Sequence, residues 1–324
     1  MSIKQYLYNI KQSYIAKNTP KLNIAEGEKI VVAENCDLKE FEKFFSDYVV
    51  VGSVSQIAEK DYGKIEIFFG APPKKSLPEM TSLKWLQLSS AGMNGYDDKA
   101  LYKTDVKVTG ARGVYGLPIS ECVIGDILFL MKPAMANTIN KKYSIPALSG
   151  KDFTGSTVIV CGLGDIGKNI ALRCKGMQCE KVIGFDKFVT DCEGVDEIYP
   201  LDKLNELIGQ ADIIASALPA VPETDGVFNE KTFSLMKQDA IFVNVGRGNA
   251  VNQEALLKAV NSKKLFGAAL DATTPDPLPK NHPLRKNGRI LITDHLACIS
   301  SKNKDRLQSY YLAQAERYIK GEKI

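Results

Sequence analysis

The 324-residue sequence predicts an α/β protein with two doubly wound domains, each built on a parallel sheet. Two observations support this fold class. Short runs rich in β-branched and aromatic residues alternate with helical patterns along almost the whole chain, which is typical of parallel sheets covered by helices. The chain is also too long for one ordinary domain and fits two.

The first series of predicted strands covers residues 29–34, 48–54, 65–69 and 83–88. Between the first two, residues 37–45 begin at Asp37, a residue type that caps helices, and place apolar side chains at 38, 41, 44 and 45. That spacing predicts a helix. Together these segments predict a smaller domain in the first third of the chain.

A second series predicts a larger array of six strands. They cover residues 157–160, 181–185, 212–215, 240–243, 265–270 and 289–292, with helical patterns between them, for example at 253–260. Residues 303–320 have the pattern of a final helix. Four prolines within residues 275–283 predict a stiff loop, because proline removes a backbone donor and fixes its own torsion angle.

Composition narrows the class of protein. Hydrophobic residues make up 44% of the chain and charged residues 25%, with a net charge of +4 spread among both signs. These values are typical of a globular protein and do not favour nucleic-acid binding. The seven cysteines form an odd set without a CxxC pair, which favours reduced thiols in the cytoplasm.

Neither a signal peptide nor a membrane segment is predicted. The first residues, MSIKQY, lack the apolar stretch of a signal peptide. The longest apolar region, residues 117–139, contains Glu121, Asp126 and Lys132, which a membrane span would tolerate poorly. We therefore expect a long amphipathic or buried helix there.

The motif GLGDIG at residues 162–167 follows an apolar strand and precedes a helical pattern. In a dinucleotide fingerprint the first glycine permits a tight turn, the second lets the backbone approach the pyrophosphate, and the third lets the helix pack on the strand. The next strand ends at Asp186, where a carboxylate can accept hydrogen bonds from the adenosine ribose and repel a 2′-phosphate. NAD is therefore the predicted cofactor, and Lys187 leaves NADP as the less favoured alternative.

Three polar residues late in the chain predict the chemistry. Arg247 lies in NVGRG, Asp276 in DATTPDP and His295 in TDHLA. A guanidinium, a carboxylate and an imidazole beside a nicotinamide can bind a 2-oxo acid and move a proton and a hydride. The chain has one other histidine, His282, which we interpret as a structural polar residue.

Several motifs in order resemble the D-isomer-specific 2-hydroxyacid dehydrogenase family over about residues 65 to 320. They are LSSAGMN at 88–94, GVYG at 113–116, the glycine fingerprint, LPAVPET at 218–224, NVGRG at 244–248, LDA at 270–272, and His295. The resemblance implies two Rossmann-like domains. A flavodoxin-like substrate domain of residues 1–105 and 294–324 would contain an inserted NAD-binding domain of residues 106–293, with hinges near 105–112 and 294–300.

The family's roles transfer to matching positions. Arg247 would hold the substrate carboxylate and the 2-oxygen, His295 would be the acid/base, and Asp276 would orient its imidazole. The substrate loop would offer backbone N–H groups from Ser90, Ala91 and Gly92, although Ser90 also suits a plain turn. The expected cofactor contacts are Gly162, Gly164, Asp165, Ile166, Gly167, Asp186, Leu218, Pro219, Thr224, Val245, Gly246 and Asp271, the last at the nicotinamide amide.

Four positions depart from the family pattern. Asp276 replaces a glutamate, Asp294 a proline, Cys298 a small residue and Cys122 a histidine. We hypothesise that Asp294 helps to keep His295 protonated. Replacing it with asparagine and measuring the pH profile of turnover tests this, since an unchanged acidic limb would contradict it.

The predicted function is NAD-dependent interconversion of a small 2-oxo acid and the D-2-hydroxy acid. Phosphoglycerate oxidation is an alternative, but the loop GAPPKK at 70–75 contains lysines and no arginine, which favours an unphosphorylated acid. Formate oxidation and a role as an NAD-sensing or corepressor scaffold are two further candidate functions. We also expect a homodimer that uses residues 117–139, whose apolar residues exceed what one helix stripe needs.

Overall fold

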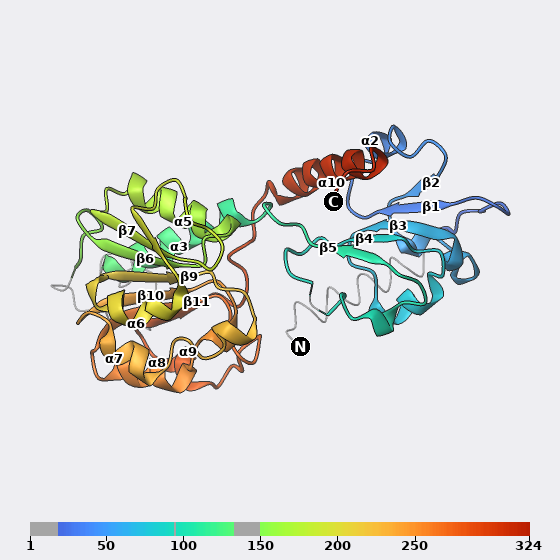
Figure 1. The fold of residues 1–324 in the computed structure, drawn as a ribbon. Helices are drawn as coiled ribbons and strands as arrows, with labels where there is room; N and C mark the ends of the chain where they lie inside the picture. Colours follow the sequence, from blue (N-terminus) through green and yellow to red (C-terminus); the bar gives the residue numbers. More distant parts are fainter. Residues whose placement is uncertain (1–18, 94, 133–149) are drawn as a thin grey trace. The chain divides into compact units, whose positions relative to one another are not determined.

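The computed structural model describes residues 19–93, 95–132 and 150–324, and these divide into two compact units (Figure 1). Unit 1 comprises residues 1–114 and 301–324, and unit 2 comprises residues 115–300. Unit 1 is therefore built from both ends of the chain, and unit 2 is inserted between them.

The described part of unit 1 forms a parallel five-stranded sheet in the order β2-β1-β3-β4-β5. The strands are β1 (Ile30–Ala33), β2 (Val49–Val51), β3 (Ile65–Phe69), β4 (Trp85–Gln87) and β5 (Lys107–Thr109). Every residue of β1 and β3 is buried, as expected for a parallel sheet that is covered on both faces.

Two helices cover one face of this sheet, α2 (Leu38–Glu42) and α10 (Asn303–Ile319). Asp37 caps α2 by accepting a hydrogen bond from the N–H of Lys39. On α10, Tyr318 stacks on Trp85 with ring centroids 4.9 Å apart, which fixes the helix to β4. Short 3₁₀ segments follow the strands, namely η1 (Val54–Gln56), η2 (Glu59–Lys64), η3 (Lys74–Glu79) and η4 (Lys99–Leu101).

Unit 2 contains a parallel seven-stranded sheet in the order β12-β11-β10-β9-β6-β7-β8. The strands are β6 (Thr157–Cys161), β7 (Lys181–Phe185), β8 (Glu197–Tyr199), β9 (Ile213–Ser216), β10 (Ala240–Asn244), β11 (Leu265–Leu270) and β12 (Ile290–Ile292). The order in which strands are added reverses between β6 and β9. Strands β7 and β8 extend the sheet on one side of β6, and β9 to β12 extend it on the other. In such sheets a ligand binds at the carboxyl ends of the strands beside that reversal.

Helices cover both faces of the unit 2 sheet. One core contains residues of α3 (Gly116–Met131) and α5 (Asp165–Gly176). The other contains residues of α6 (Leu204–Leu207), α7 (Glu230–Leu235), α8 (Gln253–Asn261) and α9 (Pro283–Lys286). The 3₁₀ segments are η5 (Leu201–Lys203), η6 (Ile208–Gln210), η7 (Pro222–Thr224) and η8 (Gly248–Ala250). No helix within the described ranges has both the length and the apolar character needed to cross a membrane.

The observed division of the chain differs from the expected boundaries at both crossings. Residues 106–114 stay with unit 1 because β5 pairs with β4. Residues 294–300 stay with unit 2 because the N–H of His295 donates to the carbonyl of Asp271, 2.8 Å away. The crossings therefore lie after residues 114 and 300 instead of 105 and 293.

Two short strands were not predicted. Both β5 (Lys107–Thr109) and β8 (Glu197–Tyr199) have three residues, partly exposed or exposed, and lie at a sheet edge. The second makes the described sheet of unit 2 seven-stranded instead of six-stranded. The expected helix over residues 117–139 is observed from Gly116 to Met131, and residues 133–139 lie outside the described part. The proline-rich region is a loop over residues 275–282, as expected, and its last proline, Pro283, begins the four-residue helix α9.

Candidate active site

The glycine fingerprint forms the turn between β6 and α5. Gly162 has a left-handed backbone, with φ of 87°. A Cβ atom on Gly167 would lie 1.8 Å from the carbonyl oxygen of Gly162, so only glycine fits where the helix packs on the strand. A Cβ atom on Gly164 would meet nothing within 4 Å, so this glycine faces open space. The turn thus leaves room for a dinucleotide where the fingerprint requires it.

Asp186 lies at the end of β7 and is tied to this turn. The N–H of Leu163 donates to its Oδ2 at 2.8 Å, and the N–H groups of Phe188 and Val189 donate to its Oδ1 at 2.8 and 3.0 Å. Burial alone would raise the pKa of Asp186, but these backbone hydrogen bonds lower it below the ordinary value. Asp186 is therefore a carboxylate fixed in position at neutral pH.

The loops after β9 and β10 pack closely on this side of the sheet. A Cβ atom on Gly246 would lie 2.4 Å from the carbonyl oxygen of Leu218. Thr224 is buried, and its hydroxyl donates to the carbonyl of Pro219 at 2.6 Å. The side chain of Thr224 therefore holds the 219–224 loop together. The Asp165 carboxylate also accepts a hydrogen bond within unit 2, because the N–H of Gly116 donates to its Oδ2 at 2.8 Å.

Arg247 follows β10 and is held by its glycine neighbours. A Cβ atom on Gly248 would lie 2.2 Å from the backbone carbon and oxygen of Thr273, so the Arg247 loop touches the loop after β11. Fully buried Asn244 joins the same two loops, because its Nδ2 donates to the carbonyls of Arg247 and Ala272. The contact with Thr273 explains why a glycine follows Arg247, and the contact of Gly246 with Leu218 explains why a glycine precedes it.

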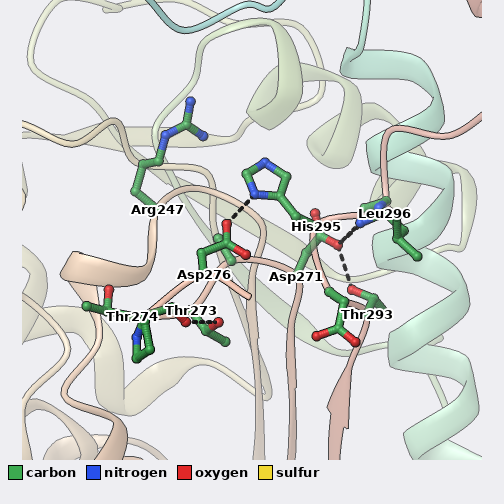
Figure 2. Close-up of polar contacts among 12 residues, drawn as sticks. Arg247, Asp271, Thr273, Thr274, Asp276, Thr293, His295 and Leu296 are labelled. Atoms are coloured by element: carbon green, nitrogen blue, oxygen red, sulfur yellow. Dashed lines mark hydrogen bonds and ion pairs between the residues drawn. The ribbon is translucent and has the colours of Figure 1, made fainter. Parts of the chain in front are cut away.

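Asp276 and His295 form a direct pair. The distance from Asp276 Oδ2 to His295 Nδ1 is 2.5 Å, and the imidazole is 49% exposed. The carboxylate accepts a hydrogen bond from the N–H group at Nδ1, so Nε2 faces away from Asp276. Figure 2 shows the imidazole and the Arg247 side chain on the same side of the loops that carry them. Asp276 reaches the histidine although it is shorter than the glutamate of the family.

The turn that carries His295 depends on Asp271, at the end of β11. Asp294 and His295 both have left-handed backbones, with φ of 52° and 60°. Asp271 supports this turn, because its Oδ1 accepts from Thr293 Oγ1 at 2.7 Å and from the N–H groups of Leu296 and Ala297 at 2.9 and 3.0 Å (Figure 2). Donors from the described residues bind this one oxygen, which leaves Oδ2 for a ligand.

Asp294 has a partner that the sequence did not indicate. Its carboxylate pairs with the guanidinium of Arg285, with Nη1 and Oδ2 3.1 Å apart. The effect of Asp294 on His295 stays a prediction, which the pH profile of Asp294→Asn tests. The Asp276 loop has a different support, because Gln253 on α8 exchanges two hydrogen bonds with the backbone of Thr274, at 2.7 and 2.9 Å.

The substrate-loop residues lie in unit 1. The Ser90 hydroxyl donates to the carbonyl of Gly92 at 2.6 Å, so it closes the turn after β4. Ala91 is exposed, and a Cβ atom on Gly110 would lie 2.4 Å from its carbonyl oxygen. In unit 2, three neighbouring strands, β10, β11 and β12, bring together Arg247, Asp271, Asp276 and His295.

Sequence reasoning did not select several residues that support these groups. Asn244, Gln253 and Thr293 bind loop backbone or the Asp271 carboxylate, and no local motif marks that role. Within the described ranges, no cluster of three or more His, Cys, Asp or Glu side chains could hold a metal ion.

Comparisons with known proteins agree with this geometry. A family model described as D-isomer specific 2-hydroxyacid dehydrogenase, NAD binding domain, matches residues 130–297, which is just over half of the chain. An uncharacterized protein in the proB 3′ region of Corynebacterium melassecola is 31% identical over 277 residues, covering 84% of this chain and 89% of that protein.

The human glyoxylate reductase/hydroxypyruvate reductase is 34% identical over 160 residues, which cover 49% of each chain. Among solved structures, a D-isomer specific 2-hydroxyacid dehydrogenase family protein from Aeromonas salmonicida is 29% identical, with a TM-score of 0.77 and coverage of 92% of this chain and 97% of that one. The motifs, the fold and these matches show that the chain belongs to the family of D-isomer-specific 2-hydroxyacid dehydrogenases.

Proposed function

We propose that the protein interconverts a small 2-oxo acid and the corresponding D-2-hydroxy acid, with His295 as the acid/base. The observation that carries this proposal is the 2.5 Å contact of His295 with Asp276, beside Arg247 at the ends of neighbouring strands. A bound nicotinamide cofactor would supply or accept the hydride at C2 of the substrate.

The chain's own residues have three tasks in this reaction. Arg247 binds the substrate carboxylate, and its planar fork suits two oxygens at once. His295 donates the proton from Nε2 to the carbonyl oxygen during reduction and takes it back during oxidation. Asp276 keeps Nδ1 protonated, so that Nε2 points to the substrate. Backbone N–H groups of Ser90, Ala91 and Gly92 are proposed to bind the substrate carboxylate as well.

NAD is the proposed cofactor. Asp186 presents an anionic carboxylate where the 2′-phosphate of NADP would have to bind. Lys187 does not offset that charge, because Glu223 binds its ammonium at 3.3 Å. Measuring the dissociation constants of NADH and NADPH tests this choice, and tighter binding of NADPH would contradict it.

The substrate is tested by NADH consumption with glyoxylate, hydroxypyruvate, pyruvate and bulkier 2-oxo acids. Glyoxylate and hydroxypyruvate come first because the human relative is named for them. NAD⁺ reduction with formate and with 3-phosphoglycerate tests two competing reactions in parallel. Activity with formate alone would overturn the proposed role of His295. Binding of NADH without turnover of any acid would favour a sensing scaffold.

We also propose a cytoplasmic homodimer that uses α3. All seven cysteines lie in the described residues and are free thiols, and Leu117 on α3 is exposed. Sedimentation at micromolar concentration tests the dimer, and a monomer would contradict it.

A further inference from the structure

Arg285 bonds to two separate segments of unit 2 at once. On one segment, its Nη2 donates to the carbonyl of Leu278 at 2.8 Å, and its Nε donates to the carbonyls of Leu278 and Pro279, each at 3.2 Å. On the other segment, its guanidinium pairs with the Asp294 carboxylate, with Nη1 and Oδ2 3.1 Å apart. One side chain therefore ties the two segments together.

The partners of this side chain lie next to the proposed acid/base pair. Leu278 comes two residues after Asp276, and Asp294 directly precedes His295. Asp276 Oδ2 and His295 Nδ1 are 2.5 Å apart (Figure 2). The contact between carboxylate and imidazole therefore depends on how closely the two segments are held.

Arg285 is itself fixed in place. It lies on α9, where Leu284 is fully buried in the core and His282 caps the helix by accepting a hydrogen bond from the N–H of Leu284 at 3.3 Å. The Arg285 side chain is 20% exposed, and its planar fork can serve two carboxylate oxygens and a carbonyl at the same time. Because a guanidinium stays charged at every physiological pH, these bonds do not depend on its protonation.

Other contacts fix each segment to its own surroundings. Gln253 on α8 binds the backbone of Thr274, and the N–H of His295 donates to the carbonyl of Asp271. The bonds of Arg285 differ from these because they cross from one segment to the other.

We infer that Arg285 is a positioning residue for the reaction, which holds the two segments together and so maintains the contact of Asp276 with His295. The inference rests on the proposed function, in which this contact keeps Nδ1 protonated and directs Nε2 to the substrate. An aspartate has a single methylene, so its carboxylate cannot follow the imidazole far. If the segments separated by about 1 Å, the contact would lengthen to about 3.5 Å, beyond an ordinary hydrogen bond.

The test needs a variant that loosens the segments without changing the net charge near His295. Arg285→Gln alone would leave the Asp294 carboxylate unpaired, and its charge would itself favour the protonated imidazole. The double variant Arg285→Gln/Asp294→Asn removes one positive and one negative charge. Asparagine also tolerates the left-handed backbone at position 294, where φ is 52°.

Two readouts separate positioning from general stability. The kcat of the double variant should fall about 10- to 100-fold while KM changes much less, because a catalytic group is displaced and Arg247 is retained. In proton NMR spectra, the downfield resonance of the proton on His295 Nδ1 should disappear or move upfield. His282 does not interfere, because its Nδ1 accepts a hydrogen bond instead of donating one. Arg289→Gln removes a guanidinium from the opposite end of β12, and this control should keep both readouts.

A longer acid at position 276 gives a further test. Asp276→Glu extends the carboxylate by one bond, about 1.5 Å, so in the double variant it should recover part of the lost kcat and bring the downfield resonance back. An unchanged kcat or resonance in the double variant, or no recovery with the longer acid, overturns the inference.

Asp294→Asn alone keeps the bonds of Arg285 to Leu278 and serves in case the double variant does not fold. Its resonance should move in the same direction, and an unchanged resonance would also overturn the inference. The resonance needs no substrate, so it decides whether Arg285 holds the pair, whereas near-natural turnover in His295→Ala would overturn the proposed function itself.

Discussion

Replacing Gly248 with alanine should separate the two loops that carry the proposed catalytic side chains. The new Cβ atom would lie 2.2 Å from the backbone of Thr273, where ordinary contact begins at 3.4 Å. The Arg247 loop would therefore have to move by more than about 1 Å away from the loop of Asp276. Overpacking of this kind costs about 1–3 kcal/mol of unfolding free energy. A displacement of about 1 Å at a catalytic group can cost about 10²-fold in rate.

The assay combines urea unfolding with steady-state kinetics on the best substrate of the panel. Gly248→Ala should lower kcat/KM by about 10²-fold and weaken NADH binding much less, because the glycine fingerprint is not displaced. Gly176→Ala is the matched control, since a Cβ atom there meets nothing within 4 Å and alanine favours the helix by up to about 1 kcal/mol. Natural stability and natural kcat/KM in Gly248→Ala would refute the reasoning.

Four further predictions concern single side chains. His295→Ala should lower turnover by about 10²- to 10⁴-fold with NADH binding nearly intact, and near-natural turnover would exclude it as the acid. Arg247→Ala should raise KM strongly and also lower kcat. An effect on kcat alone would show that Arg247 does not bind the substrate in the ground state. Asp276→Asn should give an intermediate loss and move the pH optimum of reduction downwards, because the protonated imidazole loses its counter-charge; an unchanged profile would make Asp276 a loop residue. Asp126→Asn should stabilise the protein by roughly 1–3 kcal/mol more at pH 8 than at pH 5, since burial raises the pKa of the folded Asp126 carboxyl to about 7 and the natural protein therefore loses stability as the pH rises towards 7; equal effects in urea unfolding at both pH values would contradict this.

Buried strands were predictable, and so were the edge strands β2 and β12, but the edge strands β5 and β8 were not. The apolar runs that become β3 and β11 are buried throughout, so their composition reflects both faces of the sheet. In contrast, β5 and β8 have sequences of Lys-Val-Thr and Glu-Ile-Tyr, which local composition does not distinguish from a loop. Their pairing with the preceding strand of the chain defines them, and short-range composition does not reveal that pairing.

The site shows a similar limit. The motifs placed Arg247, Asp276 and His295 after three strands that the structure shows to be neighbours. They could not show that Asp294 binds Arg285, because two side chains nine residues apart meet only through the fold.

The stacking of Trp85 on Tyr318 has a practical consequence for following this chain as it folds. Trp85 is the only tryptophan, it lies in unit 1, and its stacking partner Tyr318 belongs to α10, whereas Phe69 of β3 meets its ring edge-on. During synthesis the inserted unit is complete before α10 has left the ribosome, so unit 1 gains this contact only after Tyr318 has been added. Tryptophan emission should therefore report the final docking event, and a bound fluorescent dinucleotide should report the earlier one.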